Sequence, residues 1–228
     1  MPLTDHPHSI RSFVIRAGRI TPAQQRALEE LWPKYGVEFS PALLDAGALF
    51  GRAAARTIEI GFGNGDNLLD LATAYPQRDF LGIEVHRSGV GRVLLALESR
   101  QLHNVRLICH DAVEVLEQQI PPASVDEILI LFPDPWPKKR HHKRRLIQLP
   151  FATLAASRLA PGGVLRLATD WQPYAQEMLE TLAAVPQLAN LASDGGFVAR
   201  PAEREATRFE RRGERLGHQV WDLAFRRT

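Results

Sequence analysis

Short apolar runs alternate with longer amphipathic stretches along most of the chain. Runs rich in Val, Ile and Leu are typical of buried strands; they cover residues 57–60, 79–85, 105–109, 125–132, 164–169 and 218–225. Between them apolar residues repeat at helical spacing, which predicts helices at about residues 68–72, 87–102, 146–159 and 173–184. Strands that alternate with helices favour a doubly wound α/β fold.

The chain before the first strand has a different pattern. Residues 1–9 hold two prolines and two histidines without periodicity, which predicts irregular structure. Thr21-Pro22 predicts the start of a helix that runs to about Leu31, because a hydroxyl can cap it and proline fits the first turn. We expect an N-terminal arm and helix, residues 1–50, and a main part, residues 51–228, in a single domain overall. Packing on the main part is the favoured role of this arm; contact of its arginines with a polyanion is the alternative.

Composition excludes several classes of protein. Hydrophobic residues make up 45% and charged residues 24% of the chain, as in ordinary globular proteins. The single cysteine, Cys109, excludes an internal disulfide and argues against a cysteine-based zinc site. No apolar run is long enough to span a membrane, and the N-terminus lacks the apolar core of a signal peptide. We therefore expect a cytoplasmic protein.

The first candidate for chemistry is the run at residues 57–67, Thr-Ile-Glu-Ile-Gly-Phe-Gly-Asn-Gly-Asp-Asn. Gly61, Gly63 and Gly65 let the backbone turn tightly and approach a ligand closely. Asp66 and Asn67 are expected to cap the next helix, whose amides then point at the loop. This arrangement is typical of a nucleotide-type site, with an ordinary glycine-rich turn as the alternative.

The spacing of these glycines separates two cofactors. A dinucleotide site favours G-x-G-x-x-G, in which the third glycine lies below a pyrophosphate. Here the pattern is G-x-G-x-G, and Asp66 stands in the place of that third glycine. A carboxylate repels a pyrophosphate but is acceptable beside the sulfonium and ammonium groups of S-adenosylmethionine (SAM). The sequence therefore favours SAM over NAD.

Acidic residues stand at the carboxyl ends of the predicted strands, the edge at which open α/β sheets bind ligands. Glu84 follows the glycine loop by about 20 residues, where nucleotide-binding folds place a carboxylate for the ribose hydroxyls. Asp111 and Asp170 end two further strands. The fourth strand leads into residues 133–137, Pro-Asp-Pro-Trp-Pro, whose alternate prolines predict a stiff loop that presents Asp134. A catalytic loop is the favoured interpretation and a rigid connector the alternative.

A basic run follows this loop directly. Residues 138–145, Lys-Lys-Arg-His-His-Lys-Arg-Arg, hold six fixed positive charges, although the net charge of the whole chain is only +2. Charge runs are often solvated surface, but this one contains no acid and adjoins a candidate active-site loop. It would attract a phosphate backbone and make binding fall with salt. A metal site at His141-His142 is disfavoured, because no suitably spaced acid or cysteine accompanies the pair.

Together these motifs resemble those of the bacterial tRNA (guanine-N7-)-methyltransferases of the TrmB type. The resemblance extends in order over nearly the whole chain after residue 10, and the proline loop with the basic run is its most specific part. The matching pieces are Arg11-Ser-Phe with Gly18-Arg19, Glu59-Ile-Gly-Phe-Gly-Asn-Gly65, Gly82-Ile-Glu84, Asp111-Ala112, residues 133–144, Ala168-Thr-Asp170 and Thr207-Arg-Phe-Glu210.

The resemblance implies a class I methyltransferase fold, with a Rossmann-like, mostly parallel sheet of about seven strands. It implies methyl transfer from SAM to N7 of a guanosine in the tRNA variable loop (position 46), which yields 7-methylguanosine and S-adenosylhomocysteine. It implies tRNA as partner, no metal and no required protein partner; monomer and homodimer both stay open. The implied cofactor-binding residues are Glu59, Gly61, Gly63, Gly65, Glu84, Asp111 and Asp134, with Asp134 also catalytic. The implied substrate-binding residues are Lys138, Asp170, Thr207, Arg208, Phe209 and Glu210, and the implied RNA-binding residues are Arg140, His141, His142, Lys143, Arg144 and Arg145.

The chemistry can be argued from the substrate alone. Guanine N7 has a lone pair and no proton, so the reaction needs positioning more than a general base. Asp134 can stabilise the positive charge on the methylated purine, and Asp170 or Glu210 can accept hydrogen bonds from the guanine edge. Trp136 or Phe209 can stack on a base, although Trp136 can equally brace the proline loop. Two other functions stay as alternatives: a small-molecule SAM-dependent methyltransferase, which the basic run disfavours, and a non-catalytic RNA-binding protein, which the intact acids disfavour.

Overall fold

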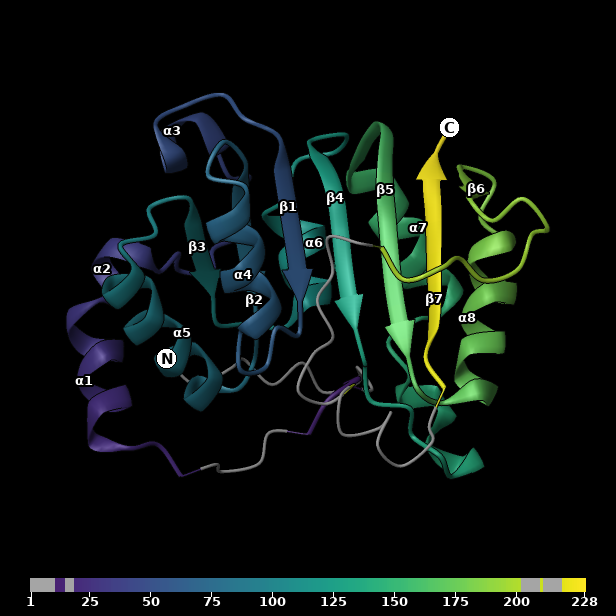
Figure 1. The fold of residues 1–228 in the computed structure, drawn as a ribbon, viewed down its shortest axis with the longest axis horizontal. Coiled ribbons are helices and arrows are strands. Elements are labelled where there is room, and N and C mark those ends of the chain that lie inside the picture. Colours follow the sequence, from purple (N-terminus) through teal and green to yellow (C-terminus); the bar gives the residue numbers. More distant parts are fainter. Residues whose placement is uncertain (1–10, 15–18, 202–209, 211–218) are drawn as a thin grey trace.

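The computed structural model describes residues 11–14, 19–201, 210 and 219–228; the irregular structure expected for residues 1–9 falls outside them. A seven-stranded sheet forms the centre of the molecule, in the order β3-β2-β1-β4-β5-β7-β6 (Figure 1). The strands are β1 (Arg56–Ile60), β2 (Asp79–Ile83), β3 (Val105–Ile108), β4 (Val125–Leu131), β5 (Leu159–Thr169), β6 (Leu188–Asn190) and β7 (Trp221–Arg227). Strands β1 to β5 pair in parallel, and β7 is antiparallel to both β5 and β6. The expected doubly wound, mostly parallel sheet is confirmed.

Helices cover both faces of the sheet, and each face has its own apolar core. On one face, α4 (Asp66–Ala74) and α5 (Arg87–Arg100) pack over β1 to β3 (Figure 1). On the other face, α6 (Ala112–Gln118) and α7 (Leu149–Arg158) lie behind the sheet in Figure 1, and α8 (Gln172–Ala183), at its right-hand edge, packs into the same core. Among the described residues, no helix is both long and apolar enough to cross a membrane.

The N-terminal helices pack along the β3 side of the sheet. They are α1 (Pro22–Glu30), α2 (Trp32–Tyr35) and α3 (Ala46–Phe50), and α1 lies against α5. The expected hydroxyl cap is confirmed: the Thr21 side chain accepts a hydrogen bond from the Gln24 amide, and the Gln24 side chain accepts one from the Thr21 amide. After α2 the chain runs beside β3, where the Val37 amide donates to the Leu107 carbonyl at 2.8 Å.

Several element boundaries differ from those expected. Helix α7 begins at residue 149 rather than 146, because the basic run forms a separate 3-10 helix, η1 (Lys139–Arg144), and Pro150 fits only in the first turn of α7. Strand β5 begins at residue 159 rather than 164 and pairs with β4 through an irregular register. Strand β7 covers residues 221–227 instead of 218–225. The short elements α6 and β6 lacked a clear pattern in the sequence.

Gly82 lets the glycine loop and α4 lie close to the sheet. It pairs with Glu59 in the β1–β2 register and faces the same core as Phe62 and Leu68. A Cβ atom at Gly82 would lie 2.7 Å from Leu68 Cδ2 and 2.8 Å from Phe62 Cδ1. Since protein cores are close-packed, any side chain at residue 82 would displace this layer.

We therefore expect Gly82→Val to lower the free energy of unfolding by about 1–3 kcal/mol through overpacking. Urea denaturation measures this change. The control is Ala189→Val, which places valine at an exposed position of β6 and should change stability by less than about 0.5 kcal/mol. Equal stability of both variants would show that Phe62 and Leu68 have room to move.

Candidate functional site

The carboxyl ends of β1 to β5 meet at one edge of the sheet, the lower edge in Figure 1. The strand order reverses there between β1 and β4, which in α/β folds opens a crevice for a ligand. A cavity lies at this point. Its walls bring together four residues expected from the sequence: Gly61, Glu84, Asp111 and Asp134.

The glycine loop adopts the conformation for which glycine is needed. Gly61, Gly63 and Gly65 have φ values of 71°, 55° and 78°, in the left-handed region. The expected caps are wrong, because Gly65 itself is the N-cap of α4 and no side chain caps that helix. Asp66 is instead the first helical residue, where its negative charge favours the helix dipole. Asn67 turns back toward β1.

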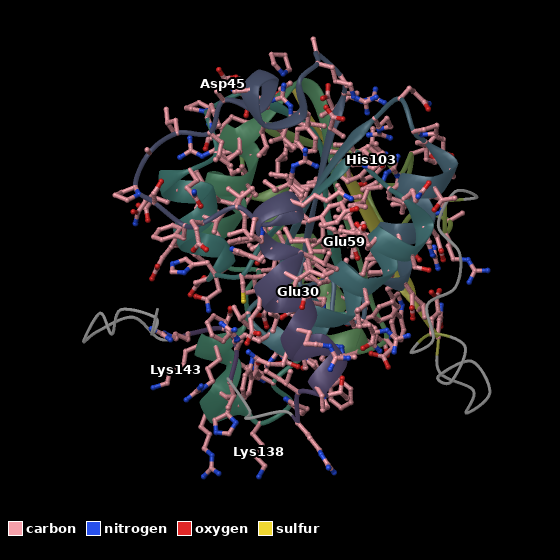
Figure 2. All side chains as sticks on the ribbon, turned by 90° about the vertical axis from the view of Figure 1, so that its left-hand side faces the viewer. Glu30, Asp45, Glu59, His103, Lys138 and Lys143 are labelled. Carbon is pink, nitrogen blue, oxygen red and sulfur yellow. The ribbon has the colours of Figure 1, made fainter. Side chains whose placement is uncertain are left out.

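Glu59 lies below the glycine loop rather than on the cavity wall. Its carboxylate accepts a hydrogen bond from Asn67 Nδ2 at 2.8 Å and is buried between β1 and α4, in the interior seen in Figure 2. Burial raises the pKa of Glu59 to about 7, and the charge of Glu84 adds to this rise, while the Asn67 hydrogen bond opposes it. Glu59 thus ties β1 to α4 and supports the loop from beneath.

Glu84 joins the ends of β1 and β2. Its Oε2 accepts from the Gly63 amide at 2.8 Å, and its Oε1 accepts from the Val85 and His86 amides at 2.7 and 3.0 Å. Each carboxylate oxygen has two acceptor sites, so Glu84 can hold the loop and still accept from one ligand hydroxyl at Oε2 in the cavity.

Asp111 combines a structural role with a place on the cavity wall. Its Oδ1 caps α6 through the Val113 amide at 2.9 Å, and burial raises the pKa of its carboxyl group. The neighbouring His110 ring stacks on Phe39 with centroids 3.7 Å apart and shares a 2.5 Å hydrogen bond with Glu114. Asp111 is therefore held in place by its hydrogen bond to α6 and by the packed ring of His110 next to it.

The proline loop after β4 is strained and braced. Phe132 and Trp136 flank residues 133–135 with φ values of 52° and 44°, which are uncommon for residues other than glycine. The Phe132 amide donates to the Ala168 carbonyl at 2.7 Å, and Trp136 Nε1 donates to the Ser12 carbonyl at 3.0 Å. The Trp136 ring also packs against Arg144 and His141. Of the two roles left open for Trp136, these contacts favour bracing.

The expected substrate-binding residues are spread around this loop. Asp134 and Asp170 follow β4 and β5, which are adjacent strands, and Lys138 is exposed just before η1. Glu210 is buried, with Oε1 3.1 Å from Arg200 Nη1. The other expected members, Thr207, Arg208 and Phe209, lie outside the described residues.

The basic run divides into an exposed part and one buried arginine. Lys138 and Lys143 project from the end of the molecule at which the parallel strands end (Figure 2). The remaining expected RNA contacts on η1 are Arg140, which is exposed, and His141, His142 and Arg144, which are partly exposed. Partial burial and the surrounding cations lower the pKa of His141. Arg145 differs from the expectation: it is only 3% exposed and is paired with Glu177, so its side chain is not presented on the exposed basic surface.

Three features of the site were not assigned from the sequence. A Cβ at Gly89, in the first turn of α5, would lie 2.3 Å from the Gly63 carbonyl oxygen, so this glycine lets α5 approach the loop. Ser12 and Phe13 line the cavity, and His110 does so beside Asp111. Of these residues, only Ser12 and Phe13 belong to a motif noted in the sequence, Arg-Ser-Phe at residues 11–13. Within the described part of the chain, no three His, Cys, Asp or Glu side chains gather as a metal site.

Comparison with known proteins points to one family. A family model described as "Putative methyltransferase" matches residues 53–223. A tRNA (guanine-N(7)-)-methyltransferase of Leifsonia xyli is 59% identical over 95% of both chains, and one of Stutzerimonas stutzeri is 56% identical over 96% of this chain and 92% of its own. The solved structure of the 16S rRNA methyltransferase KamB has a TM-score of 0.57 and 17% identity, and covers 82% of this chain and 94% of its own. At that identity the likeness shows the fold alone.

The raised pKa of Glu59 predicts a stability that depends on pH. Between pH 4.5, the ordinary value, and about 7 the folded protein binds more protons at Glu59 than the unfolded chain, so its stability falls as the pH rises. Glu59→Gln keeps an oxygen for Asn67 and has no such titration. We expect the stability of the variant relative to the native protein to rise by up to about 3 kcal/mol over this window. Urea unfolding at several pH values tests this; a constant difference would contradict it.

Proposed function

The chain belongs to the tRNA (guanine-N(7)-)-methyltransferase family, and from this premise we propose that it methylates N7 of guanosine 46 in the variable loop of tRNA. The products are 7-methylguanosine and S-adenosylhomocysteine. The observation that carries the proposal is that a cavity at the strand-order reversal lies beside an exposed basic helix, and that one strained loop, which bears Asp134, connects the two. We further propose that the protein acts in the cytoplasm as one domain with an N-terminal arm; monomer and homodimer both stay open.

The residues of the cavity fit SAM. A Cβ at Gly61 or Gly63 would meet no atom within 4 Å, so open space lies above the glycine loop. Glu84 would accept from one ribose hydroxyl, while Asp111 and apolar groups such as Phe13 would surround the adenine. SAM supplies an electrophilic methyl group on a sulfonium. The carboxylates at this edge of the sheet attract the positive charges of SAM. Glu59 contributes indirectly, because it supports the glycine loop.

The protein contributes geometry and charge to the transfer itself. The N7 lone pair forms the new bond to carbon in line with the breaking carbon–sulfur bond, whose electrons stay on sulfur. Asp134 lies between the two strained residues at the cavity wall, where its charge stabilises the purinium product. Asp170 is the better acceptor for the guanine edge, because it is partly exposed at the end of β5, the strand next to β4, whereas Glu210 is buried against Arg200.

The exposed part of the basic run contacts the tRNA backbone. Lys138, Lys139, Arg140 and Lys143 lie next to the proline loop, so phosphates bound there bring a splayed loop nucleotide toward Asp134. A methyltransferase for a small molecule would gain little from this row of cations. The basic helix therefore favours tRNA over the small-molecule alternative.

Transfer of labelled methyl from SAM to two tRNA transcripts tests the proposal. One transcript carries guanosine at position 46, and the other carries adenosine there. We expect label only in the first, mapped to N7. Equal labelling of both would reject position 46 but keep the methyltransferase, and absence of label in the presence of bound SAM would reject tRNA as a sufficient substrate.

The role of Asp134 predicts a loss in the chemical step. We expect Asp134→Asn to lower kcat for the guanosine transcript by about 100-fold, since it removes preorganised charge from the reacting purine. Single-turnover kinetics at saturating SAM and tRNA measures this. The control is Asp70→Asn, the same change in an exposed carboxylate of α4 that pairs with Arg100. Equal rates in the two variants would remove Asp134 from the catalytic site.

A further inference from the structure

Arg145 differs from every other cation of the basic run. The side chains of Lys139, Arg140 and Lys143 are exposed, whereas Arg145 is 3% exposed and follows the last turn of η1. A buried charge is costly unless it is paired and hydrogen-bonded. The contacts of Arg145 therefore indicate what this arginine does.

Its guanidinium connects the proline loop to α8. Arg145 Nε donates to the Pro135 carbonyl at 2.9 Å, and its Nη1 donates to Glu177 on α8. The same group lies over the Tyr174 ring, 4.8 Å from the centroid. Tyr174 in turn fixes the start of the following segment, because its hydroxyl oxygen accepts from the Ile147 amide at 3.1 Å.

The bonded carbonyl is at a sensitive point of the loop. Pro135 directly follows Asp134 and directly precedes Trp136, whose φ of 44° lies in the left-handed region that is unfavourable for residues other than glycine. Strained conformations persist only where surrounding contacts hold them. Arg145 holds this peptide from the α8 side, while the bond from Trp136 to Ser12 holds it from the N-terminal side.

We propose that Arg145 is a positioning residue for methyl transfer, which sets the direction of Asp134 by fixing the Pro135 carbonyl to α8, and is not an RNA contact. This rests on the proposed function, since it concerns the same catalytic loop. Arginine suits the task because its planar fork donates in two directions at once and stacks on an aromatic ring. A lysine at residue 145 has a single point charge, so it cannot bond to Pro135, pair with Glu177 and stack on Tyr174 at the same time.

The two roles predict different kinetics. An RNA contact contributes to tRNA affinity and to its salt dependence, whereas a positioning residue contributes to kcat. Arg145→Ala should therefore lower kcat by about 10- to 100-fold, the scale expected for misplacement of a catalytic group by about 1 Å. Its KM for tRNA and the slope of log affinity against log salt should stay as in the native protein. Arg145→Lys should lose less of kcat, in the same direction.

Two exposed cations serve as matched controls. Lys143→Ala should raise KM for tRNA and reduce the salt slope by about one unit, with little change in kcat. Arg100→Ala, at the exposed end of α5, should change none of these quantities.

Thermal melting of each variant reports whether it is folded. Should Arg145→Ala fail to fold, Glu177→Gln decides, because it removes only the charge that orients the guanidinium and should lower kcat several-fold at unchanged KM.

The outcomes separate this proposal from the proposed function. Arg145→Ala with raised KM, reduced salt slope and native kcat would overturn the positioning role and make Arg145 an RNA contact. Native kcat in folded Arg145→Ala, or in Glu177→Gln if the alanine variant does not fold, would likewise overturn it. Failure of the proposed function would look different: the native protein itself would transfer no methyl group to the guanosine transcript.

Discussion

The site depends on one buried carboxylate that accepts three backbone N–H groups. Glu84 joins the glycine loop after β1 to the turn after β2, and hydrogen bonds to a charged acceptor are stronger than neutral ones. The left-handed glycines allow the loop to reach Glu84, while Gly82 and Gly89 leave the space in which Phe62 and α5 pack against it. The half of the cavity beside the glycine loop, which we propose binds the cofactor, is thus preorganised by backbone contacts around a single side chain.

The other half of the cavity is preorganised by different means. The proline loop has two residues with positive φ and is held by hydrogen bonds from Arg145, from Trp136 to Ser12 and from the Phe132 amide. The residues of the basic run differ in exposure. Its exposed cations are available to a polyanion, whereas its last residue, Arg145, is buried and paired with Glu177. Our proposals assign both tRNA binding and support of the loop that bears Asp134 to this one short segment.

The fold itself does not select the substrate. A 16S rRNA methyltransferase shares the sheet at 17% identity, whereas relatives above 50% identity are tRNA (guanine-N(7)-)-methyltransferases. In this chain the proline loop and the basic helix η1 lie between β4 and α7, at the same edge of the sheet as the cavity. Under the proposed function, specificity for tRNA depends on this loop and basic helix.

Local chemistry was readable from the sequence alone. Apolar runs predicted the five parallel strands, and the three glycines predicted a tight turn of the backbone, because each of these depends on neighbouring residues. The acids at strand ends predicted the edge of the sheet at which Glu84, Asp111 and Asp134 meet around one cavity. The tertiary structure decided what depends on distant partners. It placed Glu59 below the loop, made Gly65 rather than Asp66 the helix cap, and showed that α5 needs Gly89. Arg145 is the clearest case: in the sequence it is the last of six cations, and only its contacts with Pro135, Tyr174 and Glu177 bury it, since all three come from elsewhere in the fold.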